Sequence, residues 1–225
     1  MIVMGLSGGM DSVTLLAMLL DQGRQVHCCL FSYGATHGKY EMSAAKKIVA
    51  YYQNKFPDKV YSYDINIASV MASFSSNLLI ACEREIPEGY YNDENMKKTV
   101  VPGRNLIFAF VLAGLAESMG AAKIALGVHS GDHHIYPDCR TEFVKALDST
   151  IYLSSHRKVE VIAPFLNDDK TSILQIGQAL QVPYGLTRTC YKNQPISCGK
   201  CGSCQERLEA FENCGVVDPI EYEEV

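Results

Sequence analysis

The chain has 225 residues, of which 48% are apolar and 20% charged, so we expect a globular protein with a substantial core rather than a disordered one. Its net charge of −5 argues against a large nucleic-acid interface, and no stable nucleic-acid partner is expected. No apolar run reaches the ~18 residues of a membrane span and no signal-peptide pattern opens the chain, so we expect neither a membrane partner nor secretion.

The first dozen residues, MIVMGLSGGMDS, predict a strand, a tight loop and the start of a helix. The apolar run from Ile2 to Leu6 is typical of a buried strand, and residues 7–10 form a turn. Asp11 or Ser12 is expected to cap an apolar helix that runs from Val13 to Leu20. Such a unit directs backbone N–H groups and the positive end of a helix towards one point, which suits an anion such as phosphate.

The residues of this loop indicate which kind of anion it binds. Gly8 and Gly9 lack a β-carbon, so the backbone can approach an anion closely and adopt positive φ angles. No lysine stands where a Walker loop would hold a γ-phosphate. The string S-G-G-x-D-S resembles the pyrophosphate loop of the adenylating ATPases. That resemblance implies attack on the α-phosphate of ATP, with release of AMP and pyrophosphate; a chance Ser/Gly-rich turn is the alternative.

Strands and helices are expected to alternate along the rest of the chain. Strands are predicted at 26–31, 60–67, 123–128 and 159–163, and helices at 40–56, at 106–119, up to about 154 and at 171–180. This order predicts an α/β fold with a doubly wound parallel sheet, Rossmann-like in architecture. Residues 75–99 are polar and predict a lid or binding loop. Composition changes after Pro183, so we expect a nucleotide-binding domain over 1–183 and a small appendage over 184–225 packed on it.

Several candidate ligand-binding residues follow predicted strands. Ligands of open α/β sheets bind at the edge where the parallel strands end. Gly127 lies at the C-terminal end of the fourth predicted strand and Asp132 follows it, while Tyr136 and Asp138 lie on the next loop, so all four are expected at this edge. His37 lies six residues beyond the apolar run of the second strand and is expected to reach the same site.

Three single cations, Arg104, Arg140 and Lys170, also stand near predicted strand ends. Each could contact an anion or form part of the charged surface. Cys139 could act as a thiol nucleophile, but a lone cysteine beside Pro137 is more often a packed structural residue, and we predict that role for it.

Four of the nine cysteines cluster near the C-terminal end, with the spacing C-x(7)-C-x(2)-C-x(2)-C. Four thiolates at this spacing can surround a tetrahedral zinc ion and leave no position for substrate, so we predict a structural zinc knuckle in the appendage. An iron–sulfur cluster is the competing interpretation. Disulfides are disfavoured in a chain without a secretory signal, so the cysteines indicate the cytoplasm. The predicted ligands are Cys190, Cys198, Cys201 and Cys204.

Five sequence blocks together resemble the 7-cyano-7-deazaguanine synthases of queuosine biosynthesis. They are LSGGMDS, then YG-x-x-H followed by Glu41, then VPGRN, then GV-x-x-x-D followed by YPDCR, and finally TCY with CGKCGSC and Arg207. The resemblance covers nearly the whole chain. Two departures stand out: Ala35 and Thr36 replace the family's Gln and Arg, and residues 133–135 replace a usual aromatic and glycine.

The resemblance implies an ATP-dependent carbon–nitrogen ligase with the adenine nucleotide alpha hydrolase-like fold of the pyrophosphate-loop ATPases. It would convert 7-carboxy-7-deazaguanine and ammonia to the 7-nitrile through acyl-adenylate and amide intermediates, releasing AMP and pyrophosphate. A homodimer with one structural zinc ion per chain is implied, with Mg²⁺ facing Asp11 and ammonia arriving free or from a partner. The expected catalytic residues are Asp11, Arg104, Arg140 and Lys170; ATP is expected at Leu6, Ser7, Gly8, Gly9, Met10, Asp11, Ser12 and Gly127, and the deazaguanine at His37, Asp132, Tyr136 and Asp138.

Three alternatives stay open at this point. A pyrophosphate-loop enzyme that adenylates a tRNA base for thiolation would be expected to carry basic RNA-binding extensions. A divergent relative could stop at the 7-amide or transfer the activated deazaguanine to another acceptor, as in DNA modification or defence. A non-enzymatic zinc-knuckle adaptor would have no reason to retain SGGMDS at a strand end.

Overall fold

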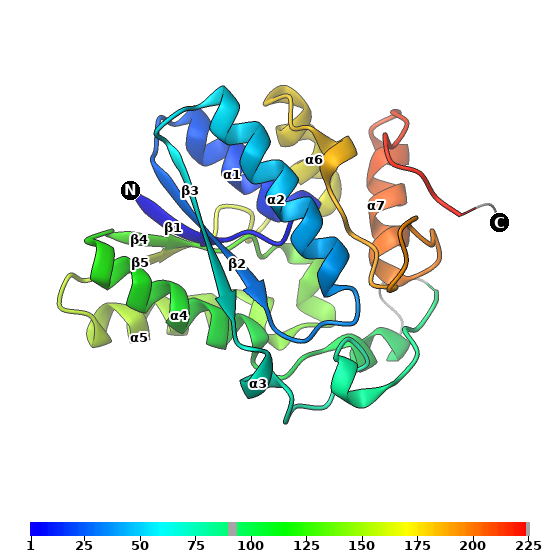
Figure 1. The fold of residues 1–225 in the computed structure, drawn as a ribbon, viewed down its shortest axis with the longest axis horizontal. Helices are drawn as coiled ribbons and strands as arrows, with labels where there is room; N and C mark the ends of the chain where they lie inside the picture. The colour runs from blue at the N-terminus through cyan, green and yellow to red at the C-terminus, as the bar shows by residue number, and fades with distance from the viewer. Residues whose placement is uncertain (90–93, 224–225) are drawn as a thin grey trace.

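The computed structural model describes residues 1–89 and 94–223. Five parallel strands form one sheet in the order β3-β2-β1-β4-β5 (Figure 1). This arrangement confirms the predicted doubly wound parallel sheet, because the strand order reverses between β1 and β4. The strands are β1 (Ile2–Gly5), β2 (Val26–Ser32), β3 (Val60–Asn66), β4 (Lys123–Ala125) and β5 (Glu160–Ile162).

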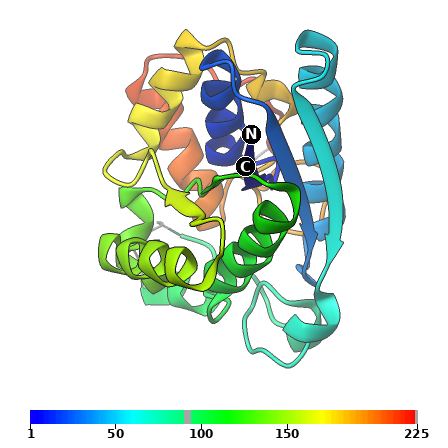
Figure 2. The same cartoon turned by 90° about the vertical axis from the view of Figure 1, so that its left-hand side faces the viewer.

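Helices cover both faces of this sheet (Figure 2). Helices α1 (Met10–Asp21), α2 (Gly38–Lys55) and α6 (Lys170–Ala179) lie on one face, and α4 (Arg104–Met119) and α5 (Thr141–Ser154) lie on the other. Along β1, Met4 points into the first layer and Val3 into the second, as the two-residue period of a strand requires. Each layer therefore has its own apolar core, and the central strands are buried on both sides.

The first helix differs from the prediction at its start. The prediction that Asp11 or Ser12 caps this helix is wrong, because α1 begins at Met10 and Gly9 is its N-cap, with no side-chain cap hydrogen bond. Asp11 stands in the first turn, and the Ser12 hydroxyl donates to the carbonyl of Gly9 at 3.1 Å. Since no side chain caps the helix, its first N–H groups are left for a ligand.

Other element bounds also shift. The fourth strand ends at Ala125 rather than residue 128, so the ligand-facing residues that follow it lie on a loop. Residues 202–213 form a helix, α7 (Gly202–Asn213), that the sequence analysis did not predict. The charged Arg207 interrupts the apolar pattern on its buried side, which also carries Ala210 and Phe211. The segment from 75 to 99 includes two 3₁₀ turns, Ile80–Cys82 and Glu94–Thr99, and its described part buries Leu78 and Leu79.

One described segment, Met96–Met119, has the length and apolar composition of a membrane span, which the sequence analysis did not expect. In the structure it consists of part of a 3₁₀ turn and the 16-residue helix α4, which packs on β1 and β4. Ala109, Leu112 and Ala116 are fully buried in that contact. Core packing therefore explains the apolar residues on one side of this helix, whereas only 28% of the apolar window is buried in the structure.

The C-terminal segment packs against the first layer. Helix α7 contacts α6, and Ala210 and Phe211 belong to the same apolar core as α1 and α2 (Figure 1). The backbone N–H of Arg188 donates to the carbonyl of Gly8 at 2.9 Å, which joins this segment to the loop between β1 and α1. The C-terminal segment thus helps to hold the loop between β1 and α1 in place.

Gly8 has the predicted positive φ, whereas Gly9 has a φ of −78°, and Gly8 is also closely packed against α2. Its φ is +82°, and an added β-carbon would lie 2.5 Å from the backbone nitrogen of Ala45 on α2. Gly215 also has a positive φ, of +66°, but a β-carbon there would meet nothing within 4 Å. Substitution of these two glycines therefore distinguishes the cost of a left-handed backbone, present at both, from the cost of steric overlap, present only at Gly8.

We predict that Gly215→Ala lowers the free energy of unfolding by ~1 kcal/mol, the cost of a left-handed backbone. Gly8→Ala should lower it by roughly 3 kcal/mol or more, because the same strain is joined by a displacement of α2. Urea unfolding of both variants measures the difference. Equal losses in the two variants would contradict the assigned role of the Gly8–Ala45 contact.

Candidate functional site

A cavity of about 230 Å³ opens at the carboxyl ends of β1, β2 and β4, where parallel-sheet proteins bind ligands. We call it the central cavity. Its wall combines the loop after β1, the start of α2, the start of α4, the loop after β4 and residues 188–206 of the C-terminal segment. The predicted site residues that line it are Leu6, Ser7, Gly9, Met10, Asp11, Ser12, His37, Arg104, Gly127, Asp132, Tyr136 and Lys170.

Three predicted site residues, all in described parts of the chain, are not brought into this wall. Gly8 packs against α2. Asp138 is buried beside α4, where its carboxylate accepts the backbone N–H of Asn105 at 2.9 Å. Arg140 is exposed, and its Nε donates to the carbonyl of His133 at 2.9 Å. Hydrogen bonds to nearby backbone groups thus engage the side chains of Asp138 and Arg140, which we expected to bind substrate.

The predicted lid also lies elsewhere. None of the described residues in 75–89 and 94–99 lines the central cavity. Leu78 and Leu79 instead pack with Tyr33 in a separate apolar cluster, and Glu88 pairs through its backbone with Cys201. The described part of this segment therefore supports the wall from behind and contacts the cysteine cluster.

The loop after β1 is closed by its own hydroxyl groups. The Ser12 hydroxyl lies 3.1 Å from the Ser7 hydroxyl and accepts the Ser7 backbone N–H at 3.3 Å. The Ser7 hydroxyl in turn accepts the N–H of Gly9 at 3.2 Å. Gly127 passes opposite, where an added β-carbon would lie 3.5 Å from the Ser12 nitrogen. Hydroxyls and the start of α1 thus face one side of the cavity, as an anion site requires.

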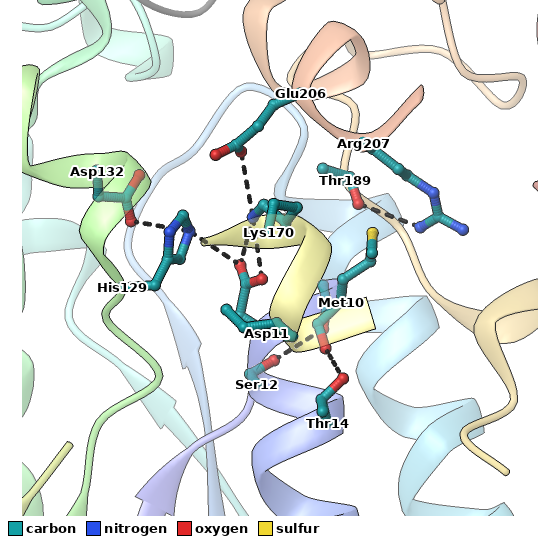
Figure 3. A network of polar contacts seen from close by, with 12 residues as sticks. Met10, Asp11, Ser12, Thr14, His129, Asp132, Lys170, Thr189, Glu206 and Arg207 are labelled. Carbon is teal, nitrogen blue, oxygen red and sulfur yellow. Dashed lines mark hydrogen bonds and ion pairs between the residues drawn. The ribbon is translucent and has the colours of Figure 1, made fainter. Parts of the chain in front are cut away.

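A group of charged side chains lies beside this loop (Figure 3). The Lys170 ammonium lies 2.8 and 2.9 Å from the two oxygens of Asp11 and 3.2 Å from Oε2 of Glu206. Burial alone would raise the pKa of Asp11, but the neighbouring Lys170 holds it below its usual value. Burial would lower the pKa of Lys170, yet Asp11 and Glu206 raise it well above its usual value. Asp11 and Lys170 are therefore an ion pair at neutral pH, whereas burial raises the pKa of Glu206 and the charge of Lys170 opposes that effect.

His129 completes this group. Its ring is buried, and Nε2 lies 3.8 Å from an Asp11 oxygen and 3.5 Å from an Asp132 oxygen. Among the residues that the structure describes, neither ring nitrogen has a hydrogen-bond partner. A buried imidazole of this kind provides polar atoms for a ligand or an ordered water.

The other side of the central cavity carries Arg104, His37 and Glu41. The guanidinium carbon of Arg104 lies 6.0 and 5.8 Å from the ring centroids of Tyr33 and Tyr136. Burial, and then the positive charge of Arg104, lowers the pKa of His37 to about 3, so its imidazole is neutral at pH 7. Burial raises the pKa of Glu41 to about 7, although Arg104 opposes this effect.

Cys139 lines the cavity but carries no reactive thiolate at neutral pH. Burial, followed by the nearby carboxylates of Asp132 and Asp138, raises the pKa of its thiol far above the usual value. The Asn105 amide donates to its sulfur at 3.2 Å. Because nucleophilic cysteines need an accessible thiolate, this geometry supports the predicted structural role.

The four clustered cysteines could hold a metal ion. Their sulfurs all lie within 4.8 Å of one another, and all four residues are completely buried. The sulfur separations of 3.6 Å for Cys190–Cys198 and 4.0 Å for Cys198–Cys204 are close to the edge of about 3.8 Å of a tetrahedron with zinc–sulfur bonds of about 2.3 Å. They exceed the ~2.05 Å of a disulfide. Backbone N–H groups of Cys198 and Cys201 point at neighbouring sulfurs, which stabilises thiolates.

Helix α7 connects this cysteine cluster to the central cavity. It begins after Cys201, contains Cys204 in its first turn, and presents Ser203 and Glu206 to the cavity. On its inner side Arg207 is fully buried, with bonds of 2.6 and 2.8 Å to the carboxylate of Asp218 and further bonds to residues 184, 187 and 189. The position of Glu206 is thus fixed from two sides.

Several cavity residues were missed by the sequence analysis. Glu206 and Ser203 are three residues apart, the spacing that places two side chains on one helix face, but this signal is readable only once α7 is known to be a helix. Arg188 and Tyr191 lie in the Cys- and Gly-rich segment, where no periodicity marks them. His129 follows the fourth strand and could have been found from that position.

Comparison with known proteins gives one family and a consistent fold. Residues 1–215 match the family model described as queuosine biosynthesis protein QueC. The 7-cyano-7-deazaguanine synthase of Caldicellulosiruptor saccharolyticus is 46% identical over 221 residues, covering 98% of this chain and 95% of that protein. The synthase of Marinomonas sp. is 42% identical over 217 residues, covering 96% and 95%.

Among solved structures, NMN synthetase from Francisella tularensis is similar with a TM-score of 0.50 and 15% identity, covering 96% of this chain and 72% of that one. At this identity the likeness concerns the fold. Together with the strand order, it confirms the predicted doubly wound α/β fold, and the cysteine cluster fits the predicted C-terminal zinc knuckle.

The raised pKa of Glu41 predicts a pH-dependent stability. The carboxyl keeps its proton up to about pH 7 in the fold but loses it near pH 4.5 when unfolded, so unfolding releases a proton between these values and stability falls as pH rises. Glu41→Gln should remove this fall, so its stability relative to wild type should rise by about 1.4 kcal/mol for each pH step of about one within this window. Urea unfolding between about pH 5 and about pH 8 measures it, with Glu209→Gln as the control at an exposed site. A stability difference that does not change with pH would contradict the prediction.

Proposed function

Since this chain belongs to the family of queuosine biosynthesis protein QueC, we propose that it is an ATP-dependent ligase that converts 7-carboxy-7-deazaguanine and ammonia to 7-cyano-7-deazaguanine. The observation that carries the proposal is the position of the S-G-G-x-D-S loop. It places the uncapped start of α1, two hydroxyls and the Asp11–Lys170 pair on one wall of the cavity. Nothing observed favours tRNA thiolation, transfer to another acceptor or an adaptor role.

The reaction begins by activating a carboxylate that ammonia cannot displace directly. The carboxylate attacks the α-phosphate of ATP, the bond to the pyrophosphate breaks, and the pyrophosphate leaves into the loop of residues 7–12. Lys170 and Arg104, which line the cavity together with Arg188, would neutralise the charge developing on the phosphates and the carboxylate. Catalysis at this step rests on positioning and on fixed charges.

Ammonia then displaces AMP from the acyl-adenylate and gives the 7-amide. The amide oxygen is activated by a second ATP in the same way, and loss of AMP and a proton gives the nitrile. Both steps use one adenylating site, so a single cavity is sufficient. Ammonia is proposed to come from solution or from a partner protein.

The Mg²⁺ that accompanies ATP would be held by Asp11, with Asp132 nearby. The Asp11 carboxylate offers at the loop the hard oxygen donors that Mg²⁺ prefers, and Asp132 lies on the other side of His129 Nε2. When bound, it would supply charge neutralisation on the phosphates. ATP itself is proposed to contact the cavity-lining residues of the loop, which are Leu6, Ser7 and residues 9–12, together with Gly127.

The deazaguanine is proposed to lie between Tyr136, His37 and Asp132. A guanine-like edge has two adjacent N–H donors that one carboxylate can accept together. Asp132 carries this proposal ahead of Asp138, because Asp132 lines the cavity and Asp138 does not. Arg140 is likewise less favoured than Arg104 as the partner of the substrate carboxylate, since Arg140 is outside the cavity wall.

A cytoplasmic homodimer is also proposed. Helix α4 is apolar around its whole circumference, and Phe110 on its outer side is 45% exposed. A helix that is apolar on all sides is normally buried, so this side suits a second copy of the chain.

Product analysis tests the proposed reaction. Incubation with 7-carboxy-7-deazaguanine, ATP, Mg²⁺ and ammonium should give AMP, pyrophosphate and a nitrile product by mass spectrometry. Asp11→Asn should lower kcat about a hundredfold or more, because a charge that positions the phosphates is lost. ADP as the product would overturn the adenylation mechanism, and an amide that accumulates with excess ATP would show a different end product.

A second prediction concerns the cysteine cluster, for which we propose zinc. Purified protein should hold about one zinc ion per chain, and Cys201→Ser should lose the metal and much of its stability, because a closed four-thiolate site stabilises the fold. Elemental analysis and thermal unfolding measure both. Iron in place of zinc, or a Cys201→Ser protein with full metal content, would contradict the prediction.

A further inference from the structure

Lys170 lies between carboxylates from two different helices. Asp11 on α1 contacts its ammonium from one side and Glu206 on α7 from the other, at 2.8 and 3.2 Å (Figure 3). The Lys170 side chain is only 9% exposed, so its ammonium has little access to water. Its position therefore depends on these two acceptors.

Glu206 is built into this position by its surroundings. An added β-carbon at Gly131 would lie 2.9 Å from Oε1 of Glu206, so the glycine leaves the space that the carboxylate occupies. Helix α7 is held by its cysteines at one end and by the buried Arg207 on the adjacent turn. The Glu206 side chain is 12% exposed and has little freedom to leave the ammonium.

A carboxylate beside the phosphate-binding loop would weaken the binding of phosphate groups. Its contact with the Lys170 ammonium offers a role that offsets this cost. Glu206 lines the cavity beside the loop that would receive pyrophosphate, where a charged carboxylate would repel phosphate oxygens. In the proposed reaction Asp11 would also hold Mg²⁺ at the nucleotide, and this role competes with its contact to Lys170. Glu206 is the acceptor that keeps the ammonium directed at the loop when Asp11 serves the nucleotide.

We infer that Glu206 is a positioning residue that fixes the Lys170 ammonium beside the phosphate-binding loop. The inference rests on the proposed adenylation function, because its benefit is a faster break of the bond to pyrophosphate. Its effect should appear in kcat rather than in affinity for ATP.

The test compares Glu206→Gln with Glu209→Gln, the same charge change at an exposed position one turn further along α7. Glu206→Gln should lower kcat for AMP formation about tenfold or more, with the KM for ATP unchanged or lower, and Glu206→Asp should restore part of the rate. Glu209→Gln should behave as wild type. Calorimetry with inorganic pyrophosphate should show affinity within about threefold of wild type for both variants, and zinc content should be unchanged.

A double-mutant cycle with Lys170→Met isolates the contact without any ligand. Urea unfolding of the two single variants and the double variant should show that Glu206→Gln has a smaller effect once Lys170 is gone. Additive effects, or a kcat of Glu206→Gln within about twofold of wild type, would overturn the inference. A joint loss of zinc and of pyrophosphate affinity would show a structural role instead and would also overturn it. If wild type forms no AMP, the proposed function fails, whereas the cycle and the calorimetry still report on Glu206.

Discussion

The buried Lys170 ammonium is the contact on which the organisation of the site depends. It brings together the first turn of α1, the start of α6 and the second turn of α7, which lie far apart in the sequence. A buried charge is tolerated only when it is paired, so these three helices can pack in one way that satisfies it. The same pairing sets the phosphate-binding loop against the wall made by the C-terminal segment.

The cysteine cluster contributes to this arrangement at a distance. Helix α7 has little apolar surface of its own, and its first turn is held by sulfurs rather than by a core. A bound metal would give this turn the rigidity that apolar packing gives to α1 and α6. A structural metal site and a nucleotide site thus share one helix, although their residues serve different chemistry.

Local sequence patterns predicted much of the fold and part of the site. The β1–loop–α1 unit, the parallel sheet and the cysteine ligand set follow from apolar period, glycine position and cysteine spacing, which are local properties. Asp138 and Arg140 were placed on the correct loop, but whether a side chain faces the cavity depends on which backbone group it meets, here those of Asn105 and His133. Glu206 could not be anticipated, because its contact with Lys170 joins residues 36 positions apart through a helix without a clear period.

Through the Arg207–Asp218 pair, the geometry of the site also depends on the C-terminal tail of the chain. Asp218 lies beyond the residues that match the family model, yet it is the counter-charge of a guanidinium with no exposed surface. Proteolytic trimming ahead of Asp218 would leave that charge buried and unpaired, which typically costs about 3–5 kcal/mol. Because Arg207 is adjacent to Glu206 on α7, such a cleavage would loosen the part of α7 that lines the central cavity, although it removes no cavity residue. A truncated version of this protein should therefore retain Asp218, and a C-terminal expression tag should follow it.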